Sequence, residues 1–305
     1  MPNLLQDGLR RLRWLSDREL NAVVFIGVDE GGVRRWGGTG FILHHEDAGR
    51  RFHYLITAEH VVRAARDASD DGQVWIRYTS NEGNAKEIKA PGEFHFGSEL
   101  ADGADVAAQI LHLHDDVTPC VSANRIVTDE VVRSYEVGPG DTTFAVGLYV
   151  RMPGSQSISP IVRSGIVAAL PLDRYQKLPY SFVPYLVESH SIGGLSGSPV
   201  YLVLREPFID GKHFGGVLTE TFLLGLAHGH WDLNVRTGGL DSDESAGHSD
   251  GSFHYELGDS IQKINEGIAV VVPGSQILDL LNADDVQAER DELSRQWDLT
   301  KGEEE

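Results

Sequence analysis

The sequence predicts an all-β protein with helices at its two ends. Short apolar runs rich in Val, Ile, Phe and Tyr recur along the chain, separated by Gly, Pro, Asp and Asn, and this is the pattern of many short strands. Long helical periods are missing between these runs, which argues against a βαβ arrangement around a parallel sheet. No repeat indicates a solenoid or a propeller. We therefore expect a barrel or sandwich architecture.

The expected strands fall into two sets, at about 20–125 and 140–273. The stretch between them contains Gly138-Pro139-Gly140, a turn signal typical of a connector. The expected strands of the two sets are 21–28, 39–45, 52–57, 73–78 and 105–113, then 142–150, 164–170, 198–204, 222–229 and 267–273. We divide the chain into an N-terminal helix, a first β unit, a second β unit and an acidic C-terminal helix or tail, at 1–20, 21–130, 131–282 and 283–305.

Helices are expected at both ends. Leu5, Leu9 and Leu12 recur at helical spacing and predict a short amphipathic helix. Near the other end, 275–281 begins a helix that 285–297 extends or follows.

The charge balance narrows the classes of partner. The 305 residues carry a formal net charge of -20, whereas binding to phosphate groups requires a basic surface, so nucleic acid is not the expected partner. Acidic membrane surfaces are disfavoured for the same reason. No apolar run of about 18 residues indicates a transmembrane helix, and the first residues lack the features of a secretory signal. Much of the acid lies in 241–250 and 284–305, and 238–252 is expected to be a flexible surface insertion.

Cysteine and histidine usage indicates no metal site and no cofactor. Cys120 is the single cysteine, so the chain cannot form an internal disulfide. A single thiol fits a reducing compartment, and we expect a cytoplasmic protein in which Cys120 is buried and inert. His112 and His114 share one strand face beside two aspartates, but no second cluster with ligand spacing accompanies them.

Residues 192–200 read IGGLSGSPV and place Ser196 among glycines. One interpretation is a tight turn between strands, and the other is a nucleophile that backbone amides surround. A serine nucleophile needs a base, usually a histidine that a carboxylate holds in one tautomer. His60 is the candidate base, because it follows the apolar run YLIT and precedes residues that begin a helical turn.

Four motifs, in order along the chain, resemble those of trypsin-like serine peptidases. They are a Gly-x-Gly-Phe strand opening, a Thr-Ala-x-His motif, an Asp-Val-Ala segment and a Gly-x-Ser-Gly-Ser-Pro motif, at Gly38–Phe41, Thr57–His60, Asp105–Ala107 and Gly194–Pro199. Each motif alone is modest, but four in this order at the ends of strand-like runs carry the resemblance. It covers about 20–282 and extends to bacterial high-temperature-requirement peptidases, without room for a PDZ domain after residue 282.

The resemblance implies two six-stranded antiparallel β-barrels of the chymotrypsin type and a serine endopeptidase acting on protein or peptide substrates. It implies that Ser196 attacks the scissile carbonyl, His60 exchanges the proton and Asp105 holds the imidazole. The amides of Gly194 and Ser196 are the implied oxyanion hole. Asp102 competes for the role of Asp105, which we prefer because an apolar strand follows it directly.

The resemblance also implies a substrate pocket. Its base is expected near Ser189 and His190, and its wall at Ala227, His228 and Gly229. No aspartate stands at the expected base, so a trypsin-like preference for Lys or Arg is not predicted. The two histidines either favour an acidic or polar side chain before the cut or face solvent.

Three alternative functions can be compared with the sequence. An α/β-hydrolase requires Gly-x-Ser-x-Gly followed by the acid and the histidine, but Ser198 stands where the second glycine is needed. A peptidase fold kept as a docking or regulatory module is the main alternative function, and the presence of all three triad residue types argues against it. A site that assembles only when an activating protein partner or ligand binds remains open.

Overall fold

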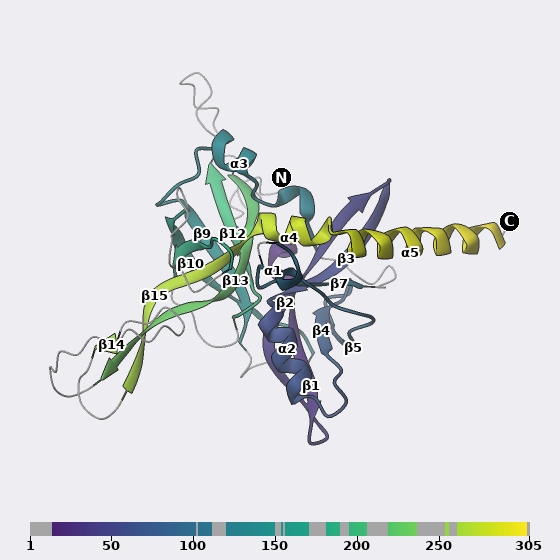
Figure 1. Cartoon of the computed structure of the whole chain (residues 1–305), viewed down its shortest axis with the longest axis horizontal. Coiled ribbons are helices and arrows are strands. Elements are labelled where there is room, and N and C mark those ends of the chain that lie inside the picture. The colour runs from purple at the N-terminus through teal and green to yellow at the C-terminus, as the bar shows by residue number, and fades with distance from the viewer. Residues whose placement is uncertain are drawn as a thin grey trace, which may run out of the picture.

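The computed structural model describes residues 14–101, 103–111, 120–149, 154, 156–170, 181–189, 195–205, 219–236, 254–255 and 261–303. Figure 1 shows two β assemblies side by side, the first drawn in purple and blue and the second in teal, green and yellow. The two sets of strands expected along the chain correspond to these two assemblies.

The first assembly is an eight-stranded sheet. Seven strands follow the order β5-β4-β1-β2-β3-β7-β6, and β8 pairs with β2 in parallel. The long β2 supports this arrangement because it pairs with β1, β3 and β8 along its length. The strands are β1 Val23–Glu30, β2 Val33–Asp47, β3 Arg50–Thr57, β4 Trp75–Thr79, β5 Ala85–Lys89, β6 His95–Phe96, β7 Ala107–Leu111 and β8 Val121–Ser122.

The second assembly contains a closed barrel of six strands. The path β12-β9-β10-β11-β15-β13 is closed by the antiparallel pairing of β12 with β13, and β14 adds to β13 in parallel. A closed barrel has no edge strands left to pair with other chains. The strands are β9 Thr142–Leu148, β10 Pro160–Ala169, β11 Tyr185–Glu188, β12 Pro199–Arg205, β13 Thr219–Arg236, β14 His254–Tyr255 and β15 Ile261–Pro273.

Helices lie at the ends and in the connections. Ser16 and Glu19 form a capping box at the first helix, which begins after the undescribed residues 1–13. The last helix has 20 residues and is longer than the short terminal helix we expected. The helices are α1 Asp17–Asn21, α2 Glu59–Ala68, α3 Asp129–Ser134, α4 Gly274–Leu281 and α5 Asp284–Glu303, with single 3₁₀ turns η1 Gly97–Glu99 and η2 Ala123–Arg125.

One hydrophobic cluster joins the two assemblies. It includes Phe41 and Tyr54 from the first sheet, and Val146 and Leu148 from the barrel, all at most 1% exposed. Polar contacts cross the same boundary: the Leu148 amide donates to Thr39 Oγ1 over 3.4 Å. The core therefore fixes the middle of β2 against β9, and the Thr39 amide of this part of β2 donates to the Ser196 carbonyl.

The structure places Cys120 and the helices, while other features singled out in the sequence lie outside the described residues. Cys120 is buried as expected, and burial raises the pKa of its thiol. Among the described residues, none of the helices is both long and apolar enough to cross a membrane. The histidines at 112 and 114 and the acidic stretch 238–252 lie outside the described residues.

Candidate active site

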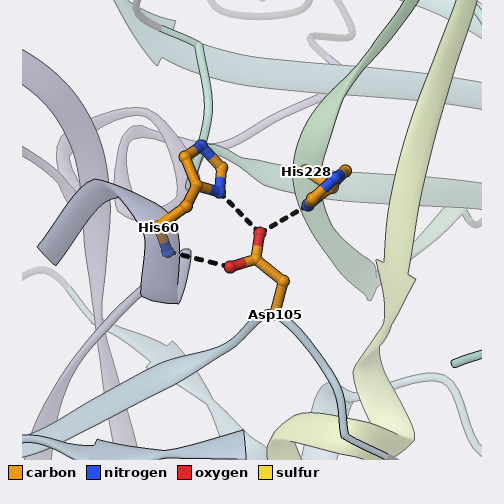
Figure 2. A group of neighbouring side chains, drawn as sticks. All are labelled: His60, Asp105 and His228. Atoms are coloured by element: carbon orange, nitrogen blue, oxygen red, sulfur yellow. Dashed lines mark hydrogen bonds and ion pairs between the residues drawn. The ribbon is translucent and has the colours of Figure 1, made fainter. Parts of the chain in front are cut away.

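Asp105 fixes both the backbone and the ring of His60. The Asp105 Oδ1 atom accepts the His60 amide over 2.9 Å, and Oδ2 lies 2.6 Å from His60 Nδ1 (Figure 2). His60 is the second residue of α2, whose N-cap Ala58 offers no side-chain hydrogen bond. Asp105 thus satisfies an amide that the helix start would otherwise leave unpaired, and the two bonds together set the direction of the imidazole.

The segment that carries Asp105 is held by burial on both sides. Ala104 and Val106 are fully buried, and the Gly97 amide donates to the Val106 carbonyl over 2.7 Å. The Asp105 side chain is 15% exposed, while the His60 side chain is 45% exposed. The carboxylate is therefore shielded behind a histidine that solvent and a ligand can reach.

A second histidine binds the same carboxylate. His228 Nδ1 lies 2.5 Å from Asp105 Oδ2, and the His60 and His228 rings meet edge to face with centroids 5.3 Å apart. Burial on its own would raise the pKa of Asp105, but the hydrogen bonds from His228 and His60 outweigh it and hold the pKa well below its ordinary value. Asp105 is therefore an ionised acceptor for two imidazoles.

The distances at this cluster are those of hydrogen bonds. One possible ligand atom from each of His60, Asp105 and His228 lies within 4.8 Å of the other two, a spacing that a metal ion also allows. Two ligands of one tetrahedral ion, each about 2.0–2.2 Å from it, stand about 3.4 Å apart, well beyond the 2.6 and 2.5 Å between the two Nδ1 atoms and Oδ2. An ionised carboxylate only accepts, so each Nδ1 carries a proton and donates it to Oδ2.

The turn that carries Ser196 lies between β13 and β2. The Ser198 amide donates to the Leu195 carbonyl over 2.9 Å, and the Gly197 amide donates to the Ala227 carbonyl over 2.7 Å. On the other side, the Thr39 amide donates to the Ser196 carbonyl over 3.3 Å. These bonds tie the turn to both assemblies and bring Ser196 beside the His60–Asp105–His228 cluster.

The hydroxyl of Ser196 points its proton at β13. Ser196 Oγ donates to the His228 carbonyl oxygen over 3.1 Å. A hydroxyl has one proton, so in this arrangement that proton is not directed at His60. The side chain has to rotate before His60 can accept the proton.

The other predicted residues are placed as follows. Ser189 is 8% exposed at the end of β11 and donates its amide to the Gly267 carbonyl over 2.7 Å. Ala227 is 7% exposed within the barrel core, and Gly229 pairs with Val270. The positions of three further residues fall outside the described residues, namely Asp102, His190 and Gly194.

Two contacts of this site were not anticipated from the sequence. Glu59, within the Thr-Ala-Glu-His stretch, is buried and accepts hydrogen bonds from the Ser98 amide at 3.1 Å and from Arg63 Nε at 2.7 Å, which anchors α2. The sequence predicts His228 at a pocket wall, whereas in the structure its ring forms a hydrogen bond with Asp105. The signal available for His228 was Gly229, because a glycine inside a strand often marks a bulge.

Comparison with known proteins gives structural likeness only. No protein-family model matches the chain, and no curated protein sequence matches it. Among solved structures, the protease domain of MamO from Magnetospirillum magneticum in its apo form has a TM-score of 0.47 and 15% identity, over 88% of this chain and 100% of that one. Human heparin binding protein has a TM-score of 0.47 and 11% identity, over 88% of this chain and 93% of that one.

Proposed function

We propose that the chain is a serine endopeptidase in which Ser196, His60 and Asp105 form the catalytic triad. The observation that carries the proposal is the pair of bonds from one carboxylate to His60, at 2.9 Å to its amide and 2.6 Å to Nδ1. Such a pair selects the tautomer that leaves Nε2 able to accept a proton, which is the requirement for a general base. Ser196, on the neighbouring turn, is the nucleophile.

The proposed chemistry follows from these positions. Ser196 Oγ forms a bond to the carbonyl carbon of a peptide as its proton passes to His60 Nε2, and the resulting imidazolium is stabilised by Asp105. His60 then protonates the leaving amine as the C–N bond breaks, which leaves an acyl group on Ser196. Water repeats the sequence and releases the acid. The amides of Gly194 and Ser196 are the proposed donors to the oxyanion.

The wider assignment is part of the same proposal. The first sheet corresponds to the first barrel of a chymotrypsin-type peptidase, resembling the bacterial high-temperature-requirement branch, and the closed barrel of β9–β13 and β15 corresponds to the second. The substrates are proteins or peptides, and the proposed compartment is the cytoplasm.

A second candidate function has one observation in its favour. The bond from Ser196 Oγ to the His228 carbonyl describes a resting state without a nucleophile–base hydrogen bond. A protein held in this state is a docking module, or a peptidase that becomes active when a partner turns the serine. The peptidase remains the better supported function, because one carboxylate holds both the amide and the ring of His60 as a general base requires.

A fluorophosphonate probe distinguishes these functions. Such a probe loses fluoride when an activated serine attacks its phosphorus, so labelling reports the nucleophile and its base together. We expect labelling of the wild type, and none of Ser196→Ala. Labelling of His60→Ala should fall by at least about 10³-fold. Folded wild-type protein that stays unlabelled would favour the docking or latent function.

The same assay separates the two candidate carboxylates. Asp105→Asn keeps the shape of the side chain but reverses the preferred tautomer of His60, so its labelling rate should fall about 10²- to 10⁴-fold. Asp102→Asn is the matched control and should label like the wild type. If the two variants exchanged these results, Asp102 would be the triad residue.

A further inference from the structure

We propose that His228 is a positioning residue, whose ring orients the Asp105 carboxylate toward His60. The inference rests on the proposed peptidase function for its effect on rate, but not for the contacts that carry it. His228 makes two contacts with the site: its ring is 2.5 Å from Asp105 Oδ2, and its carbonyl oxygen is 3.1 Å from Ser196 Oγ.

The backbone of β13 is shaped to aim this ring. Ala227 pairs with Val271 and Gly229 pairs with Val270, so β13 has one more residue than β15 in this interval, and that residue is His228. An extra residue of this kind is a β-bulge, which bends a strand and redirects a side chain. The ring of His228 consequently reaches across to Asp105, on the segment before β7, as Figure 2 shows.

The fold supports the bulge from both sides. The Ala227 amide donates to the Ser198 carbonyl over 2.9 Å, and the Gly197 amide donates to the Ala227 carbonyl over 2.7 Å. These bonds fix β13 to the Ser196 turn immediately before the bulge. On the ring itself, Phe182 packs edge to face at a centroid distance of 6.0 Å. His228 is therefore held at the point where the nucleophile turn and the carboxylate meet.

The chemistry follows from two imidazoles sharing one carboxylate. Proton transfer from Ser196 makes His60 a cation, and the single negative charge of Asp105 stabilises it. His228 Nδ1 contacts Oδ2, the same oxygen that contacts His60 Nδ1, so the ring of His228 fixes the direction in which this oxygen faces His60.

The test is the rate of fluorophosphonate labelling in the wild type and in two variants of His228. His228→Ala removes the ring that contacts Asp105, and it should lower the rate about 10- to 100-fold. His228→Asn places an amide donor near the position of Nδ1, so it should recover the larger part of the lost rate.

An NMR measurement makes the inference independent of activity. Hydrogen-bonded imidazole Nδ1–H resonances of His60 and of His228 are expected in the wild type. The resonance of His228 should be lost in His228→Asn, and that of His60 should be displaced in His228→Ala. His53→Asn, at a half-buried histidine on β3, is the matched control and should leave both signals unchanged. An unlabelled wild type with these spectra would overturn the peptidase function alone. A labelling rate in His228→Ala equal to that of an active wild type, or a His60 signal indifferent to His228→Ala, would overturn the role of His228.

Discussion

Gly197 lies directly against Thr57, the last residue of β3, so closely that a Cβ atom on Gly197 would clash with the Thr57 hydroxyl. The same Cβ would clash with the Thr39 carbonyl oxygen and stand 3.1 Å from the Ala58 amide nitrogen. Thr57 Oγ1 donates to that carbonyl over 2.7 Å, so the surface on which Gly197 rests is itself fixed. The turn that carries Ser196 therefore packs against Thr57 and Ala58, which shortly precede His60 in the chain.

Replacing Gly197 by alanine should displace Ser196 from the base. The φ of Gly197 is 83°, in the left-handed region, where a side chain costs about 1–2 kcal/mol before any clash is counted. We expect the free energy of unfolding to fall by at least that amount. The rate of fluorophosphonate labelling should fall about 10²-fold, because a shift of about 1 Å at a reacting group has this effect.

Gly37→Ala is the matched control for this substitution. Gly37 lies in β2, and a Cβ atom at this position would have no neighbouring atom within 4 Å. Denaturant unfolding and labelling of Gly37→Ala should stay close to wild type. Equal stabilities and equal labelling rates in the two alanine variants would show that the contact of Gly197 with Thr57 does not position Ser196.

The strands could be located from the sequence, but their lengths could not. The apolar run 39–45 marks the buried part of β2, which begins six residues earlier at Val33. Arg34 lies in this earlier part and packs over the Trp75 ring at 3.3 Å from its centroid. Polar residues that pair across a sheet leave no apolar run, so a search for apolar residues ends the strand too early. β13 shows the same effect, since it extends to Arg236, beyond the expected end at residue 229.

The site was predictable to the extent that motifs define it. The motifs place His60 after one strand-like run and Asp105 directly before another, and the structure brings them within hydrogen-bonding distance. The bond between His228 and Asp105 depends on a register shift between β13 and β15, which is a property of two strands together. A single sequence gives the types of residue in a strand, but not the point at which its pairing slips.

The last helix should depend on one buried arginine. Arg290 of α5 is 3% exposed, and its Nε lies 2.9 Å from Asp47 Oδ2, while Nη1 donates to Tyr54 Oη over 3.0 Å. Burial raises the pKa of Tyr54 to about 12, so this hydroxyl stays neutral. Arg290→Met removes the partner of both groups, and we expect the free energy of unfolding to fall by about 2–4 kcal/mol.

Thermal or denaturant unfolding measures this loss, and Arg295→Met controls for the loss of a positive charge on the same helix. The Arg295 side chain is 68% exposed and pairs with Glu292 over 2.7 Å, an exposed pair that is worth about 0–1 kcal/mol. A loss in Arg290→Met no larger than in Arg295→Met would contradict the role given to Arg290.

The attachment of α5 should also weaken at alkaline pH because of His95. The side chain of His95 on β6 is 14% exposed, and its Nδ1 and Nε2 lie 2.6 Å from Asp285 and 2.7 Å from Glu289. Only the cation donates from both ring nitrogens. The hydrogen bond to Glu289, assisted by Asp285 and opposed by burial, raises the pKa of His95 in the folded state. A raised pKa means that the stabilisation is complete below the unfolded value of about 6.5 and is lost as pH rises through the folded value.

Unfolding in urea at about pH 6 and about pH 8.5 tests this sign. We expect the free energy of unfolding contributed by His95 to be larger at the lower pH, and His95→Gln to remove that difference. His53→Gln is the opposite case, because burial and then Arg51 lower the pKa of His53. The folded state then binds fewer protons at this position than the unfolded state, so His53 reduces stability as pH falls. If His95→Gln kept the pH dependence of the wild type, the bonds from His95 to Asp285 and Glu289 would not hold the helix through charge.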